Sequence, residues 1–330
     1  MMDPLVFRPY LRPMVWGGRR LGEHFGKPLP EAGTFGESWE VSAHPHHVSR
    51  VAEGPLQDVA LTDLCATHRR ALFGEQVPAD GLFPLLIKLL DCHELLSIQV
   101  HPTDALAHRL SGERFGKTEA WVVLDVAPGG RIYAGLRPGV TRAELGRHLE
   151  AGTLDQCLHA FAPMPGDCVF LKAGTVHAVG GGVVLAEVQQ SSDATFRLFD
   201  WNRLGPDGEP RPLHIRESFE AIDWSLGPVA PVVGTPIAGT PAGSRGERLV
   251  RCPYFSLDRY HIGGPLDLPD PGRLSIWIIS EGAAELVGAG GYRRPFRRGE
   301  TVLVPASADR LTWRPRDPSQ PAALLAVSLP

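Results

Sequence analysis

The run Leu-Leu-Ser-Ile-Gln-Val-His-Pro at residues 95–102 places residue types that can bind a metal ion on one short segment. Side chains alternate between the two faces of a β-strand, so Gln99 and His101 share a face with Ser97. That face points either to water or into a cavity. An amide oxygen and an imidazole nitrogen that point into one cavity are two potential ligands for a divalent ion.

A short internal repeat relates two distant parts of the chain. Residues 166–177 (GDCVFLKAGTVH) and 299–310 (GETVLVPASADR) both read Gly-acid-x-Val-apolar-apolar-x-Ala. Upstream of each copy, EAWVVLD (119–125) resembles SIWIISE (275–281). The repeat predicts two related halves, each a β-barrel.

The two copies differ at positions that bear on metal binding. Arg310 replaces His177 in the second copy, and Ser275 replaces Glu119. This difference is expected if Glu119 and His177 bind a metal ion in the first barrel only. Alone, each of these residues is more often a surface or hydrogen-bonded core residue. Together with Gln99 and His101 they favour a site with two histidines and a carboxylate, which suits zinc or a similar ion.

Turn residues and short apolar runs indicate a chain built mainly from β-strands. The 37 glycines and 31 prolines fall between short apolar runs, as expected of antiparallel strands joined by turns, and a jelly roll is one such fold. Strands are expected at 85–90, 97–100, 119–125, 131–134, 167–171, 183–189 and 195–200, and from 247 onward.

Two longer segments have helical spacing of apolar residues. Residues 59–73 form the first, with Thr62 as a possible cap. Residues 141–160 form the second, in which Thr141 precedes Glu144 by three residues, the pattern of a capping box.

A stretch rich in Pro, Gly and Thr divides the chain near residue 227. It predicts a linker over residues 227–246. The expected organisation is a metal-binding β domain over 1–226, which includes both helical segments, and a smaller, degenerate β domain over 247–330.

Composition excludes several classes of protein. The 330 residues are 43% hydrophobic and 21% charged with a net charge of −4, which argues against nucleic acid or an anionic membrane as partner. The N-terminus lacks the apolar core of a signal peptide, and no apolar run is long enough to span a membrane. Five scattered cysteines without a CxxC pair indicate reduced thiols and a cytoplasmic protein.

Two other motifs are set aside. GERFGKT (112–118) has three residues between its glycines where a phosphate-binding loop needs four, and the following EAWVVLD favours a strand rather than a helix. HPHH (44–47) could bind a metal ion, but Pro45 favours a solvated loop.

Longer motifs resemble the short bacterial form of type I mannose-6-phosphate isomerase. The similarity runs in order from about residue 13 to 217. It is carried by WGG (16–18), GESWEVSAHP (36–45), FPLLIKLLDCHELLSIQVHPTD (83–104), GKTEAW (116–121), AGTVHAVGGG (173–182) and EVQQSSDATFRLFDWNR (187–203).

The resemblance implies a cupin fold, a pair of jelly rolls with helical additions, that holds one zinc ion per chain. The implied reaction interconverts mannose 6-phosphate and fructose 6-phosphate through an enediol. The implied zinc ligands are Gln99, His101, Glu119 and His177.

The resemblance also implies substrate-contacting residues. Arg197 matches the family's catalytic arginine, and Arg203 falls where the family contacts the substrate phosphate. Ser97 and Lys88 match pocket positions, and Lys117 matches a lysine two residues before the glutamate ligand, although Thr118 departs from the Lys-Pro-Glu of the larger form.

A base must move a proton between C1 and C2 of the sugar. Arg197 is a poor base because its pKa is too high. Lys117 and Glu187 are both candidates, and the sequence does not choose between them.

Two alternatives stay open at this point. One is a catalytically silent module of the same fold that binds sugar phosphates. The other is a different metal-cupin enzyme, such as an iron oxygenase, which the glutamine ligand disfavours.

Overall fold

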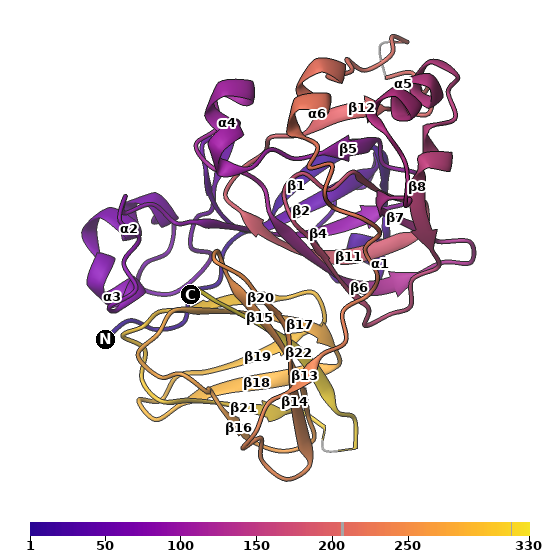
Figure 1. Cartoon of the computed structure of the whole chain (residues 1–330). Helices are drawn as coiled ribbons and strands as arrows, with labels where there is room; N and C mark the ends of the chain where they lie inside the picture. Colours follow the sequence, from indigo (N-terminus) through magenta and orange to yellow (C-terminus); the bar gives the residue numbers. More distant parts are fainter. Residues whose placement is uncertain (206–207, 318) are drawn as a thin grey trace.

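A computed structural model describes residues 1–205, 208–317 and 319–330 and shows two β-sandwiches joined along the chain (Figure 1). Each half contains one larger and one smaller antiparallel sheet. In the N-terminal half, the strands of the larger sheet are, in spatial order, β1 (Tyr10–Gly18), β2 (Phe35–His44), β4 (Leu85–Cys92), β11 (Val183–Gln190), β6 (Glu119–Val126) and β9 (Cys168–Leu171), with β3 (His47–Val48) beside β2. The smaller sheet runs β12 (Phe196–Phe199), β5 (Ile98–Val100), β10 (His177–Val179), β7 (Ile132–Leu136) and β8 (Leu158–Phe161).

The C-terminal half repeats this plan on a smaller scale. Its larger sheet runs β13 (Thr235–Pro236), β14 (Ser244–Arg251), β15 (Ser256–Ile262), β22 (Ala322–Ser328), β17 (Ser275–Glu281) and β20 (Thr301–Val304). The smaller sheet runs β16 (Leu266–Asp267), β21 (Leu311–Pro315), β18 (Ala283–Gly288) and β19 (Arg293–Arg297).

Strand pairing confirms the alignment on which the sequence repeat rests. Trp121 of β6 lies opposite Val169 of β9, and Trp277 of β17 lies opposite Val302 of β20. The neighbouring strands follow the same order, β4-β11-β6-β9 in one half and β15-β22-β17-β20 in the other. The two halves therefore share one topology and one register.

The helices are short and lie at the edges of the sandwiches (Figure 1). They are α1 (Arg20–Glu23), α2 (Leu61–Thr67), α3 (Arg69–Phe73), α4 (Asp104–Ser111), α5 (Arg142–Glu150), α6 (Ile215–Ala221) and the 3₁₀ turn η1 (Leu154–Cys157).

The helix predicted over 59–73 is instead two helices that meet at His68. The backbone of His68 (φ −123°, ψ 26°) leaves the helical region and ends the first helix. Thr62 lies inside α2, whose N-cap position is held by Ala60, so the predicted cap at Thr62 is wrong.

The helix predicted over 141–160 is half as long as expected. Its start is correct, because the Thr141 side chain accepts a hydrogen bond from the Glu144 amide at 3.2 Å. The helix ends at Glu150 because Gly152 adopts φ +67°, after which the chain turns into η1 and β8.

The larger N-terminal sheet is buried on both faces. One face, with Trp121 and Leu185, lines the interior of its own sandwich. The other face packs against the C-terminal half, where Ile87 and Val188 share a core with Ile278. This explains why most positions of β4 and β11 are apolar.

The segment expected to be a linker is fixed along its length. The amides of Val229 and Val232 donate hydrogen bonds to N-terminal carbonyls, and β14 already begins at Ser244. The division into 1–226, 227–246 and 247–330 stays a prediction.

Within the described residues, no helix has the length and apolar character needed to cross a bilayer. All five cysteines are unpaired.

Candidate active site

One row of side chains crosses the smaller N-terminal sheet and supplies half of the site. Arg197 of β12 lies opposite Gln99 of β5, and Gln99 lies opposite His177 of β10. Residues opposite each other in antiparallel strands point to the same face, so these three side chains are neighbours. His101 lies two residues beyond Gln99 and points the same way.

A second row crosses the larger sheet on the opposite side of the sandwich. Lys88 of β4 pairs with Glu187 of β11, which in turn pairs with Trp121 of β6. Glu119 lies two residues before Trp121 and therefore shares its face. The side chains of both rows, one from each sheet, thus face the interior of the N-terminal sandwich.

His101, Glu119 and His177 meet between the two sheets. One potential ligand atom from each lies within 4.8 Å of the others, and all three side chains are buried. Each histidine Nε2 is 3.5 Å from a Glu119 oxygen, His101 from Oε2 and His177 from Oε1. Gln99 joins the cluster through Nε2, 3.3 Å from His177 Nε2.

Backbone carbonyls fix the tautomer of both histidines. His101 Nδ1 lies 2.8 Å from the Ala194 carbonyl, and His177 Nδ1 lies 2.9 Å from the Thr175 carbonyl, so each Nδ1 carries the proton and donates it. Burial lowers the pKa of both imidazoles, that of His177 to about 3. The two rings are therefore neutral, and their Nε2 lone pairs point into the cluster.

Glu119 is an ionised carboxylate with one unsatisfied oxygen. Burial by itself raises its pKa, but Lys117, His101 and His177 together outweigh burial and lower the pKa well below its usual range. Lys117 Nζ donates to Oε2 at 2.6 Å, whereas the buried Oε1 has no hydrogen-bond partner. Oε1 is therefore a buried acceptor without a donor, 3.5 Å from Nε2 of His177, and can accept a bond from a cation.

The cluster lies beside a cavity of about 240 Å³. Of the predicted site residues, those that line this cavity are Ser97, Lys88, Gln99, Lys117, Glu187 and Arg197. Five cationic side chains face three carboxylates in its wall, so the lining favours an anionic ligand.

Inside the cavity, Glu187 and Lys117 form one buried charge group with Lys88. Lys117 Nζ and Lys88 Nζ lie 3.6 Å and 3.4 Å from the Glu187 carboxylate, and the Trp121 indole donates to it at 3.1 Å. Burial raises the pKa of Glu187. For Lys117 burial acts in the opposite direction, but Glu119 and Glu187 outweigh it and raise the pKa.

Comparison with known proteins identifies the chain's relatives. Residues 6–116 match the family model for the catalytic domain of type I phosphomannose isomerase. The chain is 34% identical over 311 residues to the mannose-6-phosphate isomerase of Streptococcus mutans, covering 92% of this chain and 93% of the relative. The chain belongs to the type I mannose-6-phosphate isomerase family. Mannose-6-phosphate isomerase ManA of Bacillus subtilis is similar at 35% identity, with the same coverage.

A crystal structure of the Bacillus subtilis mannose 6-phosphate isomerase superimposes with a TM-score of 0.90 and 30% identity, covering 99% of this chain and 100% of that one. The mainly β cupin architecture implied by the resemblance is confirmed. The chain is thus an enzyme of the mannose-6-phosphate isomerase family, and the site described above is its candidate active site.

Arg203 directs its guanidinium to other groups of the protein. Its Nη1 donates to the Leu95 carbonyl at 2.8 Å and its Nη2 to Asp200 at 2.7 Å. Among the residues that the structure describes, Arg203 is not part of the cavity lining.

Sequence reasoning missed four charged residues in the lining: Arg12, Glu37, Asp193 and Arg211. Glu37 and Asp193 lie within quoted motifs, but nothing in those motifs separates them from structural acids. Arg12 and Arg211 come from an edge strand and a loop, and only the folded chain brings them to the cavity.

The HPHH motif forms the turn between β2 and β3, in which Pro45 and His46 are exposed, as expected of a solvated loop, but His44 is buried. His44 is 3% exposed and lies 3.2 Å from Glu113, whereas His46 is exposed and contacts Asp193. Within the described part of the chain, the His101 cluster is the one group of three metal-ligating side chains.

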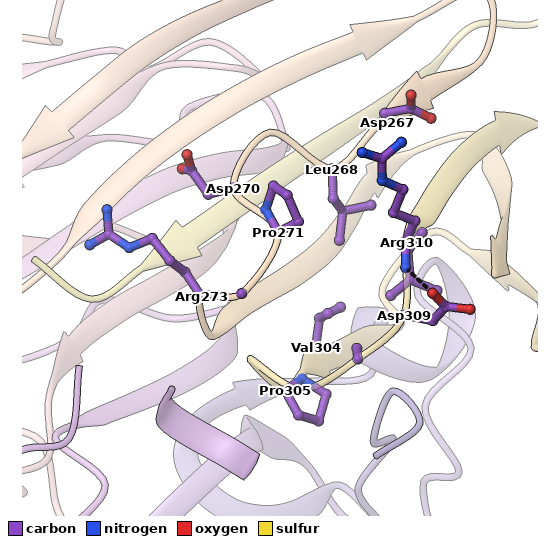
Figure 2. Close-up of a pocket in the computed structure, with 12 residues that line it drawn as sticks. Asp267, Leu268, Asp270, Pro271, Arg273, Val304, Pro305, Asp309 and Arg310 are labelled. Carbon is purple, nitrogen blue, oxygen red and sulfur yellow. Dashed lines mark hydrogen bonds between the residues drawn. The ribbon is translucent and has the colours of Figure 1, made fainter. Parts of the chain in front are cut away.

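The C-terminal half carries a pocket of about 250 Å³ whose lining, over the ranges that the structure describes, lacks the equivalents of Glu119 and His177. Figure 2 shows Arg273 and Arg310 at opposite ends of this pocket, with Pro271 and Leu268 between them. At the position of Glu119, Ser275 accepts a hydrogen bond from the Trp277 indole at 2.9 Å. In the second barrel, the polar side chain at this position is therefore hydrogen-bonded to a neighbouring residue of the same strand.

Proposed function

We propose that this enzyme interconverts mannose 6-phosphate and fructose 6-phosphate with one zinc ion bound by Gln99, His101, Glu119 and His177. The proposal rests on the substrate in the relatives' names and on the cavity, in whose lining cationic side chains outnumber carboxylates. The observation that carries it is the convergence of two neutral imidazole nitrogens on the ionised Glu119 carboxylate, whose Oε1 beside His177 has no hydrogen-bond partner.

The donor set fits zinc for reasons of chemistry. Neutral imidazole nitrogens and a carboxylate oxygen are common zinc ligands, and the bonds from Nδ1 to backbone carbonyls orient the rings as supporting contacts do in such sites. Gln99 presents its amide at 3.3 Å from His177 Nε2, and a half-turn of this amide exchanges its nitrogen for its oxygen. Ser97 Oγ, 3.3 Å from the Gln99 amide, holds this side chain in place.

Bound at these residues, zinc acts as a Lewis acid that stabilises negative charge on the sugar oxygens during enediol formation. Arg197 lines the same cavity and is opposite Gln99 across the sheet. A guanidinium at this place stabilises the same developing charge. Lys88 keeps the neighbouring carboxylates oriented, with Glu187 at 3.4 Å and Glu37 at 3.8 Å.

Glu187 is the better candidate for the base that moves the proton between C1 and C2. It lines the cavity and is a carboxylate whose buried position raises its pKa toward the range useful for proton transfer. Lys117 directs Nζ to Glu119 at 2.6 Å, to His101 at 3.1 Å and to Glu187 at 3.6 Å, so it is held as an ammonium. We assign Lys117 to charge balance beside the metal ligands.

The proposed function is tested by a coupled assay of mannose 6-phosphate turnover with wild type, Glu187→Gln and Lys117→Met. Wild type should form fructose 6-phosphate, and Glu187→Gln should lower kcat by roughly 100-fold or more while mannose 6-phosphate still binds. Wild type that binds the sugar phosphate without turnover would instead indicate a binding module. Full activity in Glu187→Gln would move the base to another residue.

A further inference from the structure

Three arginines gather around one buried carboxylate at the end of the cavity beyond Arg197. Asp200, 5% exposed, accepts Nη2 of Arg203 at 2.7 Å. It also accepts Nε and Nη2 of Arg211 at 2.7 and 2.6 Å. Arg197 lies close enough for the charge of Arg211 to contribute to its lowered pKa, after burial as the larger cause.

Positive charge exceeds negative charge in this group by two, counted over Arg197, Asp200, Arg203 and Arg211. Asp200 is the carboxylate that the structure shows in ion pairs with these arginines, within the residues it describes. A phosphate monoester carries a charge of about −1.5 to −2 near neutral pH. The excess charge therefore matches a phosphate group.

The arginines differ in the hydrogen-bond donors they keep. Arg203 uses Nη1 and Nη2 on the Leu95 carbonyl and on Asp200 and keeps a buried Nε without a partner, but it lies outside the cavity lining described above. Arg211 lines the cavity and uses Nε and Nη2 on Asp200, which leaves Nη1 without a recorded partner among the described residues. Arg197 uses Nη1 on the Pro212 carbonyl, and its buried Nε has no partner.

We propose that Arg211, rather than Arg203, binds the substrate phosphate. Asp200 clamps the guanidinium of Arg211 through two parallel bonds, and Arg203 positions Asp200 from behind. Arg211 is therefore a specificity-determining residue, and Asp200 and Arg203 are positioning residues. This inference rests on the proposed function, because it names the part of the sugar phosphate that this end of the cavity recognises.

The test measures four variants: Arg211→Ala, Arg211→Lys, Arg203→Ala and the double variant that combines Arg203→Ala with Arg211→Ala. The control is Arg216→Ala, at an arginine on α6 whose side chain is 85% exposed. Arg211→Ala should raise KM for mannose 6-phosphate by roughly 10- to 100-fold, the scale of a charged hydrogen-bond pair, and change kcat by less than about threefold. Arg211→Lys should fall between wild type and Arg211→Ala because lysine keeps the charge but loses the planar fork.

The double variant separates positioning from contact. Arg203→Ala should raise KM less than Arg211→Ala does. In a protein that already carries Arg211→Ala, it should raise KM no further, because Arg203 acts through Arg211. If Arg203→Ala raised KM for mannose 6-phosphate by the amount expected of Arg211→Ala, and Arg211→Ala left KM unchanged, the proposal would be overturned.

Calorimetric titration with inorganic phosphate keeps the inference independent of turnover. Wild type and Arg216→Ala should bind phosphate in the cavity, and Arg211→Ala should bind it at least about tenfold more weakly. Equal affinity in wild type and Arg211→Ala would refute the assignment of Arg211. Turnover that fails while this difference persists would refute the proposed reaction alone.

Discussion

Arg197 is the side chain whose removal should separate chemistry from binding. Its proposed partner, the charge of the enediol, exists only along the reaction path, so Arg197→Ala should lower kcat by roughly 100-fold or more with little change in KM. Metal content should stay normal, since Arg197 is outside the ligand cluster. Steady-state kinetics with Arg216→Ala as control measure this, and a wild-type kcat in Arg197→Ala would refute the role.

His177 should couple the stability of the metal-free protein to pH. Burial holds the pKa of His177 near 3, whereas it is about 6.5 in the unfolded chain. Between these values only the unfolded state binds the proton, so the stabilising contribution is complete above pH 6.5 and is lost as pH falls toward 3. The slope is up to ~1.4 kcal/mol per pH unit.

Urea unfolding of chelator-treated protein at several pH values checks this coupling. The stability difference between wild type and His177→Gln should shrink as the pH falls from 7 to 4. A difference that is constant over this range would show that His177 does not resist protonation.

The alternation of side chains along each strand predicted which of them point into the site. Which of them touch depends on the pairing register between neighbouring strands. Alternation placed Gln99 and His101 on one face, and the repeat singled out Glu119 and His177. The contact of Lys88 with Glu187 depends on cross-strand pairing between segments about 100 residues apart. Sequence spacing contains no direct measure of such pairing.

Helix α5 should owe part of its stability to a single cap. Thr141 satisfies the Glu144 amide, so Thr141→Ala should lower the free energy of unfolding by about 1 kcal/mol. Thr62→Ala is the matched control, because Thr62 lies within α2 and should cost little. Urea midpoints of the two variants measure the difference, and equal midpoints would rule out the cap. Activity should be unchanged in both.

Loop and helix ends were the elements that the sequence predicted least well. The periodic pattern over 141–160 continues past Glu150, but a left-handed glycine at 152 ends the helix. Arg203 matched a family position, and nothing in the sequence indicated that Arg211 lies in the cavity wall. Both outcomes depend on local backbone conformation that periodicity does not report.

The C-terminal half should stabilise the molecule without taking part in the chemistry. Ile278 is fully buried in the core shared by the two halves, so Ile278→Ala should cost about 2–5 kcal/mol of unfolding free energy. Its kcat should stay near wild type, because Ile278 packs on the side of the sheet away from the cavity. Val233→Ala, at a position 91% exposed, is the control. A large loss of kcat at unchanged fold would place the C-terminal half within the catalytic machinery.

The two related halves were predictable because each contains a tryptophan at the same position in its strand pairing. Trp121 and Trp277 occupy equivalent pairs in the two halves, so a weak repeat was enough to identify them. The shared core was less predictable, since it requires the apolar outer face of one sheet to meet that of another.

The most direct test of the account is a zinc titration of the chelated enzyme, with activity on mannose 6-phosphate and bound metal measured in the same samples. Activity should return in proportion to bound zinc and reach its maximum at about one ion per chain. His101→Ala and His177→Ala should neither retain the ion nor regain activity, whereas His108→Ala, an exposed histidine on α4, should behave as wild type. Full activity in the metal-free enzyme, or zinc retained by both variants at wild-type affinity, would contradict the account.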